Sequence, residues 1–140
     1  MPGPLENLSG PGKPLKAEDP DEEEVAGLLR TGAARLHDAR NVDLALESRF
    51  DLAYNASHAL SLAALRLKGY RAGNRFIVFQ VLPHTLGLGP EVWRVLDKCH
   101  GMRNRGEYEG LLDVDARLVT DLIAATQRVL DALGALRRLP

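Results

Sequence analysis

Hydrophobic and polar positions alternate with helical spacing along most of the chain. In four long segments the apolar residues recur at steps of three and four, which places them on one side of an α-helix. The pattern predicts helices over residues 20–36, 41–68, 90–110 and 115–137. Short connections between such helices are typical of an up-and-down bundle, so we expect an all-α fold in which the apolar faces share one core.

A fifth, shorter segment lies between the second and third of these helices. It runs RFIVFQVLPHTLGLG from Arg75, and residues 76–82 are apolar nearly all round, which predicts that they are buried. Periodicity does not separate a buried helix from a buried strand over so short a run. Because the neighbours are helical and no strand partner is visible, we expect a helix that is capped by Asn74 and bent near Pro83. The predicted fold is therefore a five-helix up-and-down bundle.

Capping residues and the composition of the N-terminus set the expected boundaries. Aspartate and asparagine suit helix starts, proline the first helical position, and glycine the turn after a helix end. The expected N-caps are Asp19, Asn41, Asn74 and either Asp113 or Asp115, with Pro20 and Pro90 at first helical positions and Gly69 and Gly110 at helix ends. Residues 1–18 are rich in proline and glycine, so we expect a flexible tail followed by one helical domain over 19–140.

Composition narrows the class of protein. The chain has 140 residues, 45% of them hydrophobic, which is enough for one buried core. Cys99 is the single cysteine, so neither an intrachain disulfide nor a multi-cysteine metal site is available. No apolar run approaches the ~18–20 residues that span a bilayer. The N-terminus also has no continuous apolar segment of the signal-peptide kind, so we expect a cytoplasmic protein without a membrane partner.

The formal net charge is −1, but the charges are unevenly distributed. Seven of the 19 acidic residues lie in the first 24 positions, where residues 21–24 suit the positive end of a helix dipole. Between Arg66 and Arg105, eight basic residues face two acidic ones, a net charge of +6. A basic middle can bind phosphate. The alternative is an arginine-rich composition with charge scattered over the surface.

Two predicted helices carry polar side chains on one face. On the helix over 90–110, steps of three and four residues connect a group of polar side chains on one face, and Arg105 follows one of them directly in the chain. Its members are His100, Arg103, Asn104, Glu107 and Tyr108. The corresponding group on the helix over 41–68 comprises Asp51, Tyr54, Asn55 and His58. Because buried polar groups need partners, we expect the two groups to form one shared site in which the Asp51 carboxylate holds the Arg103 guanidinium.

Two interpretations of this polar site remain open. One is a buried hydrogen-bond network that fixes helix register or a dimer interface. The other is a site that binds phosphate or cleaves nucleic acid. No metal or other cofactor is expected, because the histidines are dispersed and no H-x-x-x-H or E-x-x-H pair occurs. The sequence also has neither a glycine-rich phosphate loop nor a nucleophile elbow.

The pair Arg103-Asn104, followed by three residues and Tyr108, resembles the R-N-x-x-x-H signature of HEPN domains. The five-helix layout over about residues 20–138 is similar as well, and the segment SRFDLAYNASHALSLAALRLKGY resembles the family's long second helix more loosely. The resemblance implies a homodimer whose motifs face each other across a cleft. Many HEPN domains are metal-independent ribonucleases, often toxins or defence effectors. Others are inactive modules that bind nucleotides or a partner such as an antitoxin or a nucleotidyltransferase.

By this resemblance, Arg103 stabilises the scissile phosphate and Asn104 orients the motif. Position 108 departs from the family pattern, with tyrosine in place of histidine. A histidine pKa of about 6.5 suits a general base at neutral pH, whereas a tyrosine pKa of about 10 does not. His100 on the same face is the candidate substitute, although about 12 Å of helix axis separates it from position 108.

We therefore expect an RNA- or nucleotide-binding protein which, if it is an enzyme, is a weak metal-independent endoribonuclease. The alternative is a non-catalytic helical interaction module with a structural polar network.

Overall fold

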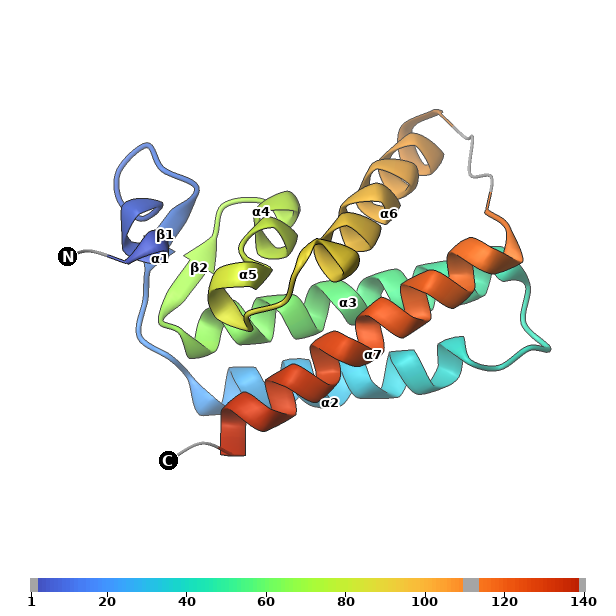
Figure 1. Ribbon diagram of the computed structural model, residues 1–140, viewed down its shortest axis with the longest axis horizontal. Helices are drawn as coiled ribbons and strands as arrows, with labels where there is room; N and C mark the ends of the chain where they lie inside the picture. Colours follow the sequence, from blue (N-terminus) through green and yellow to red (C-terminus); the bar gives the residue numbers. More distant parts are fainter. Residues whose placement is uncertain (1–2, 110–113, 139–140) are drawn as a thin grey trace.

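Helices make up most of the described chain, and a short pair of strands joins two segments that are distant in sequence (Figure 1). The structure, a computed structural model, describes residues 3–109 and 114–138, and for residues 107–109 it describes the backbone alone. Its elements are α1 (Pro4–Asn7), β1 (Leu15–Ala17), α2 (Glu22–Ala39), α3 (Leu46–Leu67), β2 (Tyr70–Ala72), α4 (Arg75–Gln80), α5 (Leu82–Thr85), α6 (Pro90–Glu109) and α7 (Ala116–Arg138).

α3 is the element on which most of the others pack. α2 and α7 lie beside it, and α4, α6 and β2 contact it as well (Figure 1). Alanines recur along its buried surface and let neighbouring helices approach closely. At Gly32 of α2 the approach is so close that an added Cβ would lie 2.7 Å from the Cγ of Leu60. A side chain at position 32 would therefore force the two helices apart.

The helical class predicted from the pattern is confirmed, and α2, α3, α6 and α7 correspond to the four long helices expected. The fifth predicted helix is divided into α4 and α5, with Pro83 in the first turn of α5. Five of the seven residues over 76–82 are buried, as the apolar run predicted. Among the described residues, no helix combines the length and the apolar character that crossing a membrane requires.

Several predicted helix boundaries are confirmed. The Oδ1 atoms of Asn74 and Asp115 each accept a hydrogen bond from the backbone N–H three residues ahead, at 3.0 and 2.8 Å. Pro90 opens α6, and Gly69 follows the end of α3 with a φ of +89°, a conformation that glycine adopts without strain. Gly110 and Asp113 lie outside the described residues.

Two predicted N-caps are wrong. α2 is capped by Asp21, whose Oδ1 accepts hydrogen bonds from the next residues of the helix, and Asp19 instead offers its backbone oxygen to Arg66. α3 begins at Leu46 rather than after Asn41, whose side chain accepts a hydrogen bond from the N–H two residues ahead. In both cases the side chain can satisfy a nearby turn as well as a helix start, and local sequence does not separate the two.

The N-terminal segment differs most from the expectation of a flexible tail and a fold without strands. β1 pairs antiparallel with β2, with Leu15 opposite Ala72 and Ala17 opposite Tyr70. Leu15 is buried in the core, with 1% of its surface exposed. One well-buried leucine and a partner more than fifty residues away hold the segment in place, although it is rich in proline and glycine.

A group of charged side chains, here called the Arg66 cluster, fixes the same segment to the end of α3. It consists of Arg66, Arg71, Glu18 and Glu24. The Arg66 guanidinium is 1% exposed and donates to Glu24 Oε1 at 2.6 Å and to the backbone oxygen of Asp19 at 2.7 Å. Hydrogen bonds from Arg71 lower the pKa of the Glu18 carboxyl, and those from Arg66 lower the pKa of Glu24. In the cluster, two arginines of the basic segment that begins at Arg66 therefore pair with two glutamates.

Candidate functional site

Side chains from α3, α4 and α6 meet around the buried phenol ring of Tyr54. We call this group the Tyr54 cluster, and it comprises Tyr54, His58, Phe76, Phe79, His100, Arg103 and Asn104. It brings together the two polar faces that the helical spacing had paired. Three of its members come from the proposed motif region of α6 and two from the matching face of α3.

His100 is held at both ring nitrogens. Its Nδ1 lies 2.9 Å from the hydroxyl of Tyr54, and its Nε2 lies 3.2 Å from Nδ2 of Asn104. Because the amide nitrogen of Asn104 can only donate, Nε2 accepts, and the proton of the neutral ring resides on Nδ1, which donates to Tyr54. Burial lowers the pKa of His100, the charges of Arg103 and Arg75 act in the same direction, and Asp97 opposes them. The imidazole is thus neutral and fully engaged near pH 7.

His58 and Tyr54 are kept uncharged by the same surroundings. Burial lowers the pKa of His58 to about 4, and repulsion from Arg75, from the protonated form of His100 and from Arg103 acts in the same direction. Burial also raises the pKa of Tyr54, and the guanidinium of Arg75 works against that rise. The phenol therefore stays protonated and the imidazole stays neutral. Arg75 and Arg103 are thus the arginines whose charges act on His58.

The guanidinium of Arg103 lies over the ring of Tyr54, with its central carbon 5.0 Å from the ring centroid. This is a cation–π contact, in which the positive charge faces the electron-rich ring. The predicted partner, Asp51, is exposed, and among the described residues no ion pair joins it to Arg103.

The other predicted site residues are less closely connected. Asn55 is half-buried and Arg105 is exposed, and no hydrogen bond between either side chain and the cluster is present among the described residues. The backbone of α6 continues through Glu107 and Tyr108, but their side chains lie outside the described part of the structure. The role of position 108 thus stays a prediction from the sequence.

Arg75 and Phe76 complete the site and were not among the predicted site residues. Both lie at the start of α4, and the ring centroid of Phe76 is 5.6 Å from that of His100. Phe76 belongs to the run over 76–82 that was expected to be buried, yet it is exposed in the structure, as is Arg75. An arginine directly before an aromatic residue was the available signal. The same order occurs at Arg49 and Phe50, where the aromatic ring is buried, so the signal is not specific.

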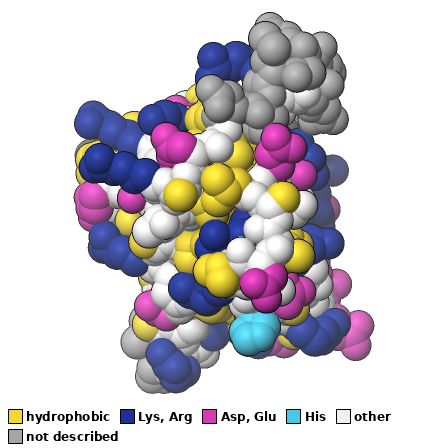
Figure 2. Space-filling model, turned by 90° about the vertical axis from the view of Figure 1, so that its right-hand side faces the viewer, with side chains coloured by type: hydrophobic (Ala, Val, Ile, Leu, Met, Phe, Trp, Pro, Cys, Tyr) yellow, Lys and Arg dark blue, Asp and Glu magenta, His cyan; other side chains and the backbone are white. Residues whose placement is uncertain are grey.

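The net positive charge predicted for the segment between Arg66 and Arg105 is partly neutralised, because Arg66 and Arg71 are paired with carboxylates. Positive charge next to the Tyr54 cluster comes from Arg75 and Arg103. Elsewhere charges of both signs are mixed. Figure 2 shows a face on which basic and acidic side chains surround a central hydrophobic area. The binding of an extended polyanion over this whole face is therefore not favoured.

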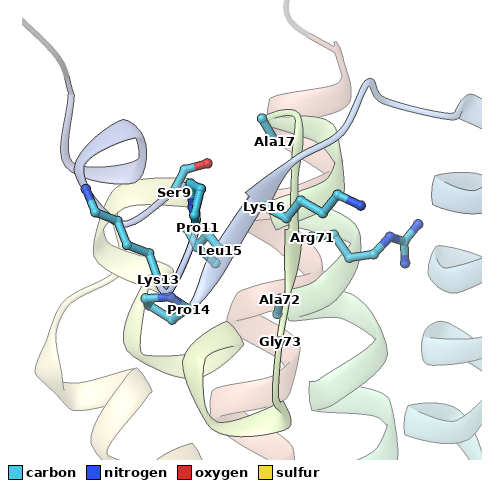
Figure 3. A pocket seen from close by; sticks show the side chains of 11 residues that line it. Ser9, Pro11, Lys13, Pro14, Leu15, Lys16, Ala17, Arg71, Ala72 and Gly73 are labelled. Carbon is cyan, nitrogen blue, oxygen red and sulfur yellow. The ribbon is translucent and has the colours of Figure 1, made fainter.

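A hollow of about 540 Å³ lies away from the cluster, between the N-terminal segment and β2. Lys13, Lys16 and Arg71 line it, but the end of Lys13 points to one side and those of Lys16 and Arg71 to the other (Figure 3). Lys13 donates to a backbone oxygen, and Arg71 is paired with Glu18. The rest of the lining is mostly apolar, so no group of cations converges on an anion there. A smaller hollow of about 230 Å³ borders His58 and Arg75.

The Tyr54 cluster can bind an anion more readily than it can move a proton. Arg103 belongs to it and the charge of Arg75 reaches it, and a guanidinium is a group that suits phosphate. Both nitrogens of His100 are engaged, so neither is placed to take a proton from a ribose hydroxyl. Within the described residues, no three histidine, cysteine or acidic side chains gather closely enough to hold a metal ion.

Comparisons of this chain with known protein families, with curated proteins and with solved structures found no match. The resemblance to HEPN domains therefore depends on the motif residues and the helical layout alone.

Proposed function

We propose that the protein is a HEPN-like domain that binds RNA or nucleotides through phosphate contacts at the Tyr54 cluster. The single observation that carries this proposal is the meeting of His100, Arg103 and Asn104 around Tyr54. Guanidinium groups suit phosphate because their planar donors match its oxygens. A homodimer that juxtaposes two such clusters is the assembly implied by the resemblance.

The binding test compares two arginines on the same helix. Arg103→Ala removes the charge over Tyr54, and Arg105→Ala removes an exposed charge two residues away. Fluorescence anisotropy with labelled RNA should show at least about a tenfold loss of affinity for Arg103→Ala, since a charge-assisted hydrogen bond contributes about 1.5–3 kcal/mol. Arg105→Ala should bind nearly as the wild type does. Equal affinities of the two variants would refute the assignment.

The proposed enzymatic form is a slow, metal-independent cleavage of RNA. It is expected to be weak, because the neutral ring of His100 has no free nitrogen and the Tyr54 phenol stays protonated. Incubation of RNA with the purified protein in a chelator tests this, with Arg103→Ala and Tyr108→Ala as comparisons. Cleavage that persists undiminished in Arg103→Ala would point to a contaminating nuclease.

A second candidate is a non-catalytic interaction module that serves a protein partner, such as a nucleotidyltransferase or an antitoxin. The engagement of both His100 nitrogens and the complete burial of Tyr54 favour it, because a satisfied network is a structural device. Under this alternative, Arg103→Ala lowers the unfolding free energy while the wild type shows no affinity for RNA. Wild-type RNA binding that depends on Arg103 excludes it.

A further inference from the structure

Phe76 differs from the other exposed apolar residues of the protein. Among the described residues, three large hydrophobic side chains are exposed: Val42, Leu44 and Phe76. Val42 and Leu44 are aliphatic and lie in the connection between α2 and α3. Phe76 is the aromatic one, with 37% of its surface exposed, and it lies at the edge of the Tyr54 cluster. An exposed aromatic ring beside cationic groups is an arrangement that folding alone does not require.

The ring of Phe76 is supported from within the protein. Its centroid lies 5.6 Å from that of His100 at an interplanar angle of 43°, and His100 is itself held by Tyr54 and Asn104. A ring braced in this way loses little conformational freedom when a ligand packs against it. The support comes from the same imidazole that connects the α6 motif to α3.

An arginine comes directly before this ring in the chain. Arg75 precedes Phe76 at the start of α4 and is exposed, and its charge reaches both Tyr54 and His58. The hollow of about 230 Å³ next to Arg75 and His58 leaves room beside the guanidinium. By contrast, the half-buried ring of Trp93 already has the guanidinium of Arg94 over it, 5.6 Å from the centroid. Arg75 and Phe76 are therefore consecutive residues of α4 whose side chains are both exposed.

We propose that Phe76 is a stacking platform for an unpaired nucleobase and that Arg75 contacts the adjoining phosphate, so that the RNA bound at the Tyr54 cluster is single-stranded. This inference depends on the proposed RNA-binding function and adds the substrate class. Bases within a duplex stack on one another and do not offer their faces to a side chain, whereas unpaired bases do. Stacking on an aromatic ring is tolerant of sequence, because every base has a π face.

The test uses a short labelled oligouridylate, alone and annealed to its complementary oligoadenylate, with inorganic polyphosphate as a ligand that has charge but no bases. Wild-type protein should bind the single strand more tightly than the duplex. Phe76→Ala should weaken single-strand binding by about 5- to 150-fold, the range for one stacked base. Phe76→Trp should retain the affinity, and Phe76→Leu, which keeps apolar bulk without a π face, should lose it. None of the three should change the affinity for polyphosphate.

Leu44→Ala is the matched control, because Leu44 has the same exposed fraction, 37%, and lies outside the cluster. It should leave every affinity unchanged, and thermal unfolding establishes that each variant is folded. If Phe76→Ala or Phe76→Leu binds the single strand as the wild type does, or if duplex and single strand bind equally, the stacking platform is refuted while the arginine-dependent function stands. If wild-type protein binds neither RNA, the proposed function and this inference both fail.

Discussion

The Arg66 cluster and the Tyr54 cluster both surround an arginine, but the neighbours that the arginine packs against differ. Arg66 is buried against two carboxylates and backbone oxygens, and hydrogen bonds from Arg71 and Arg66 lower the pKa values of Glu18 and Glu24, respectively. Arg103 lies over a neutral phenol, close to two imidazoles that its charge helps to keep neutral. The first setting pairs a buried arginine with acidic side chains and holds the N-terminal segment to the fold, whereas the second packs a guanidinium over an aromatic ring beside two histidines.

The largest expected effect is on the stability that the Arg66 cluster provides. Arg66→Ala should lower the unfolding free energy by about 3 kcal/mol, because it leaves two carboxylates and several carbonyl oxygens without their shared donor. Urea unfolding followed by circular dichroism measures this. Arg105→Ala, at an exposed position, should stay within about 0.5 kcal/mol of the wild type. A loss below about 1 kcal/mol for Arg66→Ala would mean that the cluster does not anchor the N-terminal segment.

The contributions of the two clusters to the unfolding free energy should also be lost in different pH ranges. His58 has a folded pKa of about 4 against a reference of 6.5, so between these values the unfolded chain binds a proton that the native state does not. The unfolding free energy therefore falls by up to about 3 kcal/mol as the pH drops from 6.5 towards 4, and it recovers when the pH is raised again. Glu18 and Glu24, with lowered pKa values, stabilise the fold above their reference of 4.5 and lose that contribution below it.

His58→Gln separates the two contributions. The substitution removes the titrating group, so the dependence of stability on pH between 4.5 and 6.5 should flatten, while the loss below 4.5 persists. Because the pKa of His100 is also lowered, the unfolding free energy should keep a smaller dependence on pH in the upper range. Urea unfolding in a pH series measures both ranges. An unchanged slope above pH 4.5 would show that His58 is not held neutral in the folded protein.

A smaller effect is expected from Tyr54→Phe, which removes the hydroxyl that meets His100 and keeps the ring under Arg103. The loss should be about 1 kcal/mol, the typical net contribution of one hydrogen bond. Chemical denaturation gives the stability, and NMR of the imidazole ring reports whether Nδ1 of His100 changes environment. An unaltered imidazole spectrum would contradict the hydrogen bond on which the geometry of the cluster depends.

The smallest effect is expected from Arg71→Ala in the Arg66 cluster. Arg71 is 39% exposed and pairs with Glu18, which is 40% exposed, so water and salt screen the interaction. The loss should stay below about 1 kcal/mol and shrink as the salt concentration rises. A loss as large as that of Arg66→Ala would show that the two arginines act as one unit, which a double-variant cycle would then quantify.

The sequence predicted those features that depend on residues close together in the chain. The steps of three and four residues placed Tyr54 and His58 on one face of α3, and His100, Arg103 and Asn104 on one face of α6. Contact between these two helix faces was expected because both faces also carry apolar residues, which must be buried, and buried polar groups need partners. The caps at Asn74 and Asp115 followed from local hydrogen-bonding chemistry in the same way.

The features that were missed depend on partners far apart in the chain. Three-residue strands show no periodicity, and nothing local announces that Leu15 will lie opposite Ala72. The pairing of Arg66 with Glu24 crosses 42 positions. Phe76 looked like core because its neighbours are apolar, although the α4 surface on which it lies is left uncovered. Asp51 shares a helix face with Tyr54, but the depth of burial changes within one turn, and spacing alone does not reveal it.

The strand pairing has a practical consequence for anyone who prepares shortened forms of this protein. A version that starts at α2 would remove β1 and leave the backbone groups of β2 without their partners, an edge that invites association with other chains. It would also take away Glu18 and the carbonyl oxygen of Asp19, on which the buried guanidinium relies. Trimming the proline- and glycine-rich leader to improve crystals or solubility should therefore yield aggregates, and tags are better placed after α7.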